Sequence, residues 1–171
     1  DINKMTNYDY LNKNEKRSGY PTIDKPWYVN YNKNELEKEI QKRTVFQEVY
    51  DNNIKFQKDL ALEFFGSKIN YSTFFKNIEM TAKAFKEYGI KKGDFVTICA
   101  AGIPETVYSF YALSKIGAVA NMIAPHFEKK DLIARISDCE SDTLIIMDEC
   151  YPELKKEKKG SRIKNIIILQ T

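Results

Sequence analysis

The sequence predicts an α/β fold, a parallel β-sheet alternating with helices in a Rossmann-like layered arrangement. Four short and almost wholly apolar segments support this prediction, at residues 95–100, 118–123, 143–147 and 165–169. Helical patterns or long connections separate them, which is typical of parallel strands buried on both faces. An extended arm, a helix and a short hairpin are predicted to precede these layers.

Two regions are predicted from the composition along the chain. Residues 1–43 are polar, contain Pro21 and Pro26, and predict an extended N-terminal arm, whereas residues 44–171 predict one α/β subdomain. Aromatic side chains in a polar arm usually pack on a neighbouring core. We therefore expect the arm to be anchored by Trp27, Tyr28 and Tyr31.

A helix and a hairpin are expected at the start of the subdomain. Thr44 is a good N-cap for a helix that continues to about Phe56. Its apolar stripe comprises Val45, Phe46, Val49, Tyr50 and Ile54. Residues 61–65 and 68–70 predict two short strands that turn around Gly66 and Ser67.

Three helices are predicted between the apolar strands or before them. Residues 71–88 form the first, which is expected to start at Ser72 or Thr73 and to bury Phe74, Phe75, Ile78, Ala82 and Phe85. The second runs from Pro104 to about Ile116, with Val107, Phe110, Tyr111 and Ser114 on one face. The third spans residues 128–138, with Leu132, Ile133 and Ile136 directed inward.

Glycines are expected to end two of these helices, since a residue with positive φ commonly follows the last turn. Gly89 follows the first helix and Gly117 follows the second. Residues 148–164 are polar and predict a connection to the last strand.

The last apolar run, Ile167–Leu169, resembles a central strand of a parallel sheet. No helix follows it in the sequence, so the chain is expected to be an incomplete part of a larger fold. A truncated sheet exposes apolar surface, and self-association is therefore a further expectation.

Composition excludes several classes of protein. The 27 basic and 24 acidic residues give a net charge of +3, which is too balanced to indicate a nucleic-acid partner. No apolar run approaches the ~20 residues that a transmembrane helix needs. Cys99, Cys139 and Cys150 lack the spacing of a zinc site and predict reduced thiols in a cytoplasmic protein.

Motifs of nucleotide binding and of nucleophilic catalysis are absent from the sequence. It contains no P-loop, no G-x-G-x-x-G and no G-x-S-x-G. The single histidine, His126, is interpreted as a loop residue, and Glu105 and Asp94 are assigned to a helix terminus and a turn. We therefore assign no catalytic residue and no metal ligand.

A cluster of lysines is the remaining candidate site. Lys155, Lys156, Lys158 and Lys159 form a charge run that is either solvated or a landing site for a phosphate-bearing cofactor.

Five segments in order resemble the N-terminal part of the AMP-forming adenylating enzymes, which include acyl-CoA synthetases, luciferases and peptide-synthetase adenylation domains. These segments are Ile69–Phe74, Ala82–Phe85, Tyr88–Asp94, Ile103–Glu105 and Lys115–Val119. The segment Gly19–Trp27 resembles the opening of bacterial AMP-dependent synthetase-like proteins. One departure is Ala101-Gly102, where similar proteins often have Pro-Asn.

The resemblance implies an ATP-dependent ligase that converts a carboxylic acid to an acyl-adenylate and then to a thioester, with ATP, Mg²⁺ and coenzyme A as cofactors. The catalytic motifs of that family lie downstream of the matched region, so the resemblance assigns none to this chain. Its expected partners are the remainder of the parent enzyme and a small carboxylic acid. Lys155 and Lys156 are the candidate contacts to the coenzyme A phosphate.

Two alternatives stay open. The chain could be a stand-alone interaction or binding module derived from the same fold, which a native stop codon after Thr171 would favour. A small Rossmann-like nucleotide binder is less favoured, because no glycine loop follows any predicted strand.

Overall fold

A computed structural model describes residues 18–32, 39, 41–126, 129–155 and 162–170, and the chain divides into two units, residues 1–42 and 43–171. The first unit contains the short helices α1 (Pro21–Asp24) and η2 (Pro26–Asn30). The Asp24 carboxylate accepts hydrogen bonds from the backbone N–H of Ser18 and of Gly19, both at 2.9 Å. The anchoring of the arm by its aromatic residues stays a prediction.

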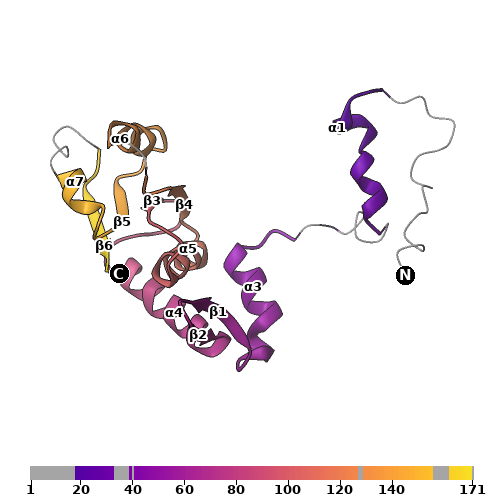
Figure 1. The fold of residues 1–171 in the computed structure, drawn as a ribbon, viewed down its shortest axis with the longest axis horizontal. Helices are drawn as coiled ribbons and strands as arrows, with labels where there is room; N and C mark the ends of the chain where they lie inside the picture. The colour runs from indigo at the N-terminus through magenta and orange to yellow at the C-terminus, as the bar shows by residue number, and fades with distance from the viewer. Residues whose placement is uncertain (1–17, 33–38, 40, 127–128, 156–161, 171) are drawn as a thin grey trace. The chain divides into compact units, whose positions relative to one another are not determined.

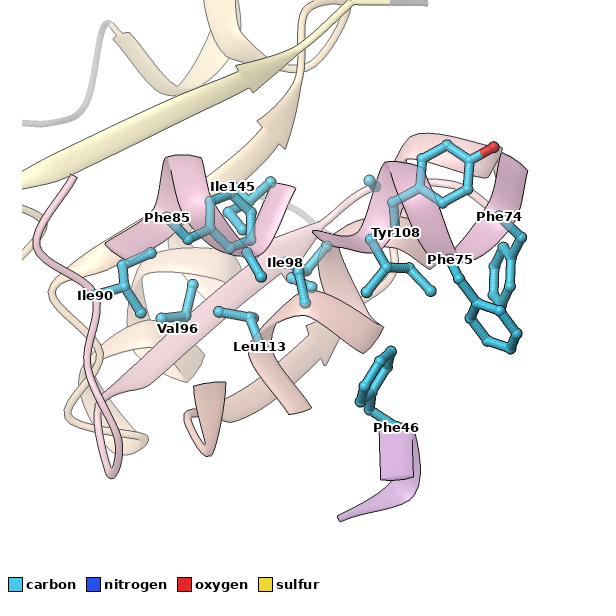
Figure 2. Packing of buried hydrophobic residues seen from close by; sticks show 14 of the residues in the cluster. Phe46, Phe74, Phe75, Phe85, Ile90, Val96, Ile98, Tyr108, Leu113 and Ile145 are labelled. Atoms are coloured by element: carbon cyan, nitrogen blue, oxygen red, sulfur yellow. The ribbon is translucent and has the colours of Figure 1, made fainter. Parts of the chain in front are cut away.

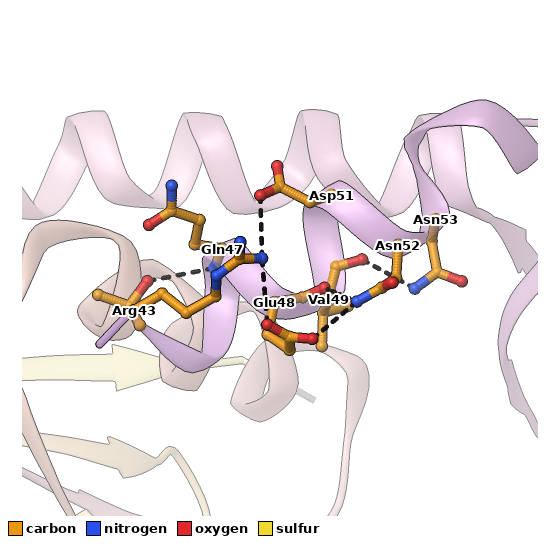
Figure 3. A network of polar contacts seen from close by, with 8 residues as sticks. Arg43, Gln47, Glu48, Val49, Asp51, Asn52 and Asn53 are labelled. Atoms are coloured by element: carbon orange, nitrogen blue, oxygen red, sulfur yellow. Dashed lines mark hydrogen bonds and ion pairs between the residues drawn. The ribbon is translucent and has the colours of Figure 1, made fainter. Parts of the chain in front are cut away.

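The second unit begins with helix α3 (Val45–Asn53) and the helical turn η3 (Ile54–Phe56). The Thr44 hydroxyl accepts a hydrogen bond from the Gln47 backbone N–H at 3.1 Å, so the predicted N-cap is confirmed. On the exposed side of the helix, the Arg43 guanidinium lies 3.1 Å from a Glu48 carboxylate oxygen and 3.3 Å from one of Asp51 (Figure 3). These ion pairs join Arg43, which precedes the N-cap Thr44, to two acidic residues of α3.

Strands β1 (Leu60–Phe64) and β2 (Ser67–Asn70) form the predicted antiparallel hairpin. Its turn is one residue earlier than expected, at Phe65 and Gly66, since Ser67 already pairs with Phe64. Both turn residues have positive φ, 45° and 82°, which matches the twist of a two-residue hairpin.

Helix α4 (Tyr71–Glu87) begins immediately after the hairpin. The predicted start at Ser72 or Thr73 is wrong, because the Asn70 side chain accepts the Thr73 backbone N–H at 2.9 Å and caps the helix. Asparagine at the end of β2 is as good a cap as serine and lies at the residue where the backbone leaves the strand. The predicted buried stripe of this helix is confirmed.

A four-stranded parallel sheet with order β4-β3-β5-β6 follows in the described part of the chain, and it confirms the predicted fold class. The elements in chain order are β3 (Phe95–Cys99), α5 (Pro104–Ile116), β4 (Val119–Ile123), α6 (Lys129–Asp138), β5 (Thr143–Met147), α7 (Tyr151–Lys155) and β6 (Asn165–Leu169). α7 lies within the polar connection of residues 148–164, for which no helix was predicted, and β6, whose apolar run resembles a central strand, lies at an edge of the described sheet.

The two faces of the sheet are covered by different helices (Figure 1). Val96, Ile98 and Ile145 point to the face that packs with α3, α4 and α5, where they meet Phe46, Phe75 and Leu113 (Figure 2). Leu144 and Ile146 point to the opposite face and pack with Leu132 and Ile136 of α6 and Leu154 of α7. The alternation of side chains along β5 thus builds two separate core clusters.

The most buried residues of helix α5 lie outside the predicted face, although Val107, Phe110 and Tyr111 of that face pack against the core. Its most buried side chains are Thr106, Tyr108, Ser109, Ala112 and Leu113. The four predicted residues are only half-buried. The helix contacts the sheet on one side and α3 and α4 on another, so more than one stripe is covered and a single periodic face does not describe it.

The two helix-ending glycines adopt positive φ as predicted, 99° at Gly89 and 87° at Gly117. A Cβ at Gly117 would lie 3.0 Å from the Lys92 Cγ, whereas one at Gly89 would have no neighbour within 4 Å. We expect Gly89→Ala to lower the free energy of unfolding by about 1 kcal/mol through backbone strain, and Gly117→Ala to lower it by more, about 2 kcal/mol.

Urea unfolding of the Gly117→Ala, Lys92→Ala double variant tests this account. When Lys92 is already alanine, Gly117→Ala should lower the free energy of unfolding only as much as Gly89→Ala does. The steric contact is then removed and only the backbone strain remains. An unchanged cost in the double variant would contradict the steric part of the explanation.

Candidate functional site

The carboxyl edge of the parallel sheet is the candidate functional site. All four strands run in the same direction, so the segments that follow them emerge at one edge. These segments are residues 100–103 after β3, residues 124–126 after β4 and residues 148–150 after β5. Functional residues of α/β proteins are commonly carried by such segments, on a rigid sheet.

The boundary between β3 and β5 is the switch point of this edge. From β3 the chain passes through α5 to β4, and from β5 it passes through α7 to β6, which lies on the other side of the sheet. α5 packs on one face of the sheet and α7 on the opposite face. Ligands of open α/β sheets bind at the strand ends where two successive connections diverge in this way.

Hydrogen bonds hold the two segments at the switch point together. The Ala101 backbone N–H donates to the Met147 sulfur at 3.0 Å, which ties the segment after β3 to the end of β5. The Cys150 N–H donates to the Met147 carbonyl at 3.1 Å, and the Asp148 N–H donates to the Leu169 carbonyl of β6 at 2.9 Å. At the position of the Pro-Asn departure, Ala101 therefore supplies an N–H that a proline would lack.

Two cysteines flank this junction. Burial raises the pKa of the Cys99 thiol to about 11, and the nearby Cys150 adds to that shift. Burial also raises the pKa of Cys150, with further contributions from the negative charges of Glu149 and Asp148. Cys99, Cys139 and Cys150 are free thiols. Near pH 7 Cys99 and Cys150 are protonated, which makes them weak nucleophiles.

Of the four candidate lysines, the structure describes Lys155. Lys155 is exposed in the last turn of α7, the helix that leaves the switch point. Lys156, Lys158 and Lys159 lie outside the described residues.

Three other residues singled out from the sequence lie on different elements. His126 is exposed in the turn after β4, and β3 separates β4 from β5 in the sheet. Glu105 is exposed in the first turn of α5. The Asp94 carboxylate accepts the Lys91 backbone N–H at 2.9 Å, in the turn before β3.

Sequence patterns did not indicate Ser141, although it joins two strands. Its side chain is fully buried, and its hydroxyl oxygen accepts the Thr97 N–H at 3.1 Å. The same oxygen lies 3.0 Å from the Phe95 carbonyl and 2.9 Å from that of Thr143. This bridge stabilises the β3–β5 pair at the end opposite the switch point, so Ser141 is structural.

The chemistry of the described residues is limited. Among them, no group of three or more His, Cys, Asp or Glu side chains is placed to hold a metal ion. Within the same residues, no helix is both long enough and apolar enough to cross a membrane.

The fold and its switch point define a doubly wound α/β unit with a candidate ligand-binding edge. The AMP-binding enzyme family matches residues 50–171, which is more than half of the chain. The chain belongs to this family, and the resemblance found in the sequence is confirmed.

Curated relatives include acetyl-coenzyme A synthetases of Brucella canis and Brucella suis. Each is 42% identical over 82 residues, covering 48% of this chain and 13% of the relative. The chain therefore spans only a small part of the length of these relatives.

Solved structures show the same fold. The anthranilate CoA ligase AuaEII superposes with a TM-score of 0.70 at 18% identity, over 76% of this chain and 26% of that one. A long-chain-fatty-acid-CoA ligase, FadD1 of Archaeoglobus fulgidus, gives 0.70 at 19% identity, over 77% and 28%. The N-terminal subdomain of Klebsiella oxytoca NpsA gives 0.59 at 25% identity, over 61% of this chain and 27% of that one. The chain corresponds to the N-terminal part of such an AMP-forming ligase.

Proposed function

We propose that the complete protein is a cytoplasmic ligase that activates a small carboxylic acid with ATP. The acid forms an acyl-adenylate with release of pyrophosphate, and a thiol, for which we propose coenzyme A, then displaces AMP to give a thioester. The family match over residues 50–171 carries this proposal. The names of the relatives, which are acetyl-CoA synthetases and acyl-CoA or aryl-CoA ligases, support coenzyme A as the acceptor.

The 171 residues serve as a structural part of that enzyme and are inactive alone. Their sheet provides one wall of the acyl site, and the remainder of the parent chain supplies the reacting groups. We assign ATP and Mg²⁺ to that remainder, because the catalytic motifs that the family resemblance implies lie downstream of the matched region. Mg²⁺ there spreads the charge of the triphosphate.

An ATP–pyrophosphate exchange assay tests this division of roles. The complete enzyme is expected to catalyse exchange that depends on its carboxylic acid, and residues 1–171 alone are expected to give none. Acid-dependent exchange by the 171-residue chain would overturn the proposed division, because it would place the catalytic groups within these residues.

Lys155 and Lys156 are proposed to contact a phosphate of coenzyme A. The support comes from the position of Lys155, whose exposed side chain extends from the helix that leaves the switch point. A lysine ammonium attracts a phosphate as a point charge. The sign and exposure of Lys155 therefore fit the group, and Lys156 follows it directly in the sequence.

Charge reversal of Lys155 in the complete enzyme tests whether this residue contacts coenzyme A without taking part in adenylate formation. Lys155→Glu is expected to raise the KM for coenzyme A about tenfold, the loss of one charge-assisted hydrogen bond, while acid-dependent pyrophosphate exchange is unchanged. Lys76→Glu, an exposed lysine of α4, is the matched control and should leave both quantities unchanged. An unaltered KM in Lys155→Glu would remove Lys155 from the proposed contact.

A stand-alone interaction module remains the second candidate. Exposed apolar side chains on the two outer strands favour it, namely Val119 and Met122 on β4 and Ile168 on β6. Such a surface would associate with a partner or with a second copy of the chain. The reading frame distinguishes the two candidates, since a native stop codon after Thr171 would favour the module. Sedimentation of residues 1–171 tests the exposed surface itself: a monomer over a wide concentration range would count against self-association under either candidate.

A further inference from the structure

We propose that β4 is a self-association surface, at which the free edges of β4 from two copies of the chain pair antiparallel about a twofold axis at Asn121. β4 lies at one end of the sheet order β4-β3-β5-β6, and within the described residues it pairs with β3 alone. Pairing would join the sheets of the two copies into one continuous sheet. The surface does not depend on the proposed ligase activity, so the two proposals can fail separately.

The outer edge of β4 presents backbone groups that β3 does not use. The Val119 N–H donates to the Asp94 carbonyl at 2.8 Å, so the backbone polar groups of Val119 point to β3. Backbone polar groups of successive strand residues point to opposite sides, and those of Ala120 and Met122 therefore point away from β3. The β3–β4 register is continuous from Val119 to Ile123, so no bulge interrupts this edge.

β4 also lacks the features that usually prevent two sheet edges from pairing. Natural edge strands are protected by charged side chains, especially lysine, by proline or by bulges. Residues 116–125 contain no charged side chain, and their one proline, Pro125, follows the strand. The opposite edge differs, because the exposed basic residues Arg162 and Lys164 precede β6. We therefore assign the self-association to β4.

The side chains of β4 are complementary to those of a second copy in this register. With Asn121 opposite the same residue of the second copy, Met122 lies opposite Ala120, so a large side chain meets a small one. On the other face of the strand, Val119 lies opposite Ile123. Met122 and Val119 are 49% and 43% exposed, so pairing covers apolar surface. Since the strand is uncharged, two copies meet without like-charge repulsion.

The central residue of this register leaves the edge accessible. The Asn121 side-chain amide donates to the Thr97 hydroxyl at 3.1 Å, which directs that side chain toward β3 and away from the free edge. β4 contributes residues Val119–Ile123, a short segment for a protein interface. We therefore expect a weak dimer whose population rises with protein concentration.

Sedimentation of the 171-residue chain over a wide concentration range tests the proposal. The native chain should form dimers. Met122→Lys places a charge on the free edge and should raise the dissociation constant of the dimer about tenfold or more. Ile168→Lys replaces an apolar residue of β6 that is 43% exposed, and this matched control should leave the dissociation constant unchanged.

Asn121→Cys tests the register. The Cα atoms of directly opposed residues in a non-hydrogen-bonded antiparallel pair are about 4.5 Å apart, within the ~4.4–6.8 Å that a disulfide bridges. Mild oxidation should therefore link two copies through residue 121, which peptide mapping distinguishes from links through the native cysteines. Ile168→Cys should give no such link through residue 168.

Three results would overturn the proposal: a native chain that stays monomeric, a dimer that Met122→Lys leaves intact, or a dimer that Ile168→Lys dissociates instead. Circular dichroism shows whether each variant folds. Should Met122→Lys fail to fold, Ala120→Pro decides the question, because it removes an N–H from the free edge and leaves the β3–β4 hydrogen bonds in place. Dimers of Ala120→Pro as stable as those of the native chain would then refute the pairing.

Discussion

Replacing Phe46 with alanine is expected to lower the free energy of unfolding by about 3–5 kcal/mol, the usual cost of truncating a buried phenylalanine. The Phe46 ring is 8% exposed and lies 5.6 Å from the Tyr50 ring and 6.5 Å from the Phe75 ring. The Lys115 ammonium lies 4.4 Å from its centroid. These contacts pack α3 on α4 and α5, so their loss should destabilise the larger core cluster (Figure 2).

Val45 provides the matched control for this measurement. It is the neighbouring residue of the same helix and is 53% exposed. Val45→Ala should change the free energy of unfolding by less than about 0.5 kcal/mol in the same urea titration. Equal effects of the two substitutions would mean that α3 does not pack on the rest of the unit.

The second large effect expected is a loss of stability at high pH that depends on Cys99. Its pKa is raised from about 9 to about 11 in the folded chain, so the unfolded chain loses the thiol proton first as the pH rises. The contribution of Cys99 is fully present below pH 9 and is lost as the pH rises through 11. Two pKa units correspond to about 2–3 kcal/mol.

Comparison with Cys99→Ala isolates this contribution, since lysines and tyrosines titrate in the same range in both proteins. Urea unfolding at pH 8 and pH 11 should show a smaller loss of stability for the variant than for the native chain. Cys139→Ala retains Cys99 and should lose as much stability between pH 8 and pH 11 as the native chain. Identical pH dependence in the native chain and Cys99→Ala would show that Cys99 is not buried as described.

Local patterns predicted the elements whose environment is simple. α4 packs one face on the core and leaves the other in water, so its apolar periodicity identified the buried stripe, Phe74 to Phe85. Thr44 and Gly117 were recognised because capping depends on residues close in sequence. α5 was misjudged, because neighbours distant in the sequence cover more than one of its faces.

The candidate site was less accessible to such reasoning. Lys155 was singled out by charge alone, and nothing in its neighbourhood indicated that its helix leaves the switch point of the sheet. The order β4-β3-β5-β6 determines that relation, and strand order depends on pairings between distant segments. For the same reason, the sequence did not show that Cys99 and Cys150 lie at the ends of neighbouring strands.

The sequence by itself determined the class of this protein: apolar strands alternating with capped helices, and a series of family segments from Ile69 to Val119. The strand and helix patterns reflect local conformational preferences, and the family segments reflect common ancestry. Both can be recognised from the order of residues along the chain. Only the tertiary structure decided which strand ends are neighbours and which face each helix covers. Such relations are set by burial and hydrogen bonding between residues far apart in sequence, which no local pattern encodes.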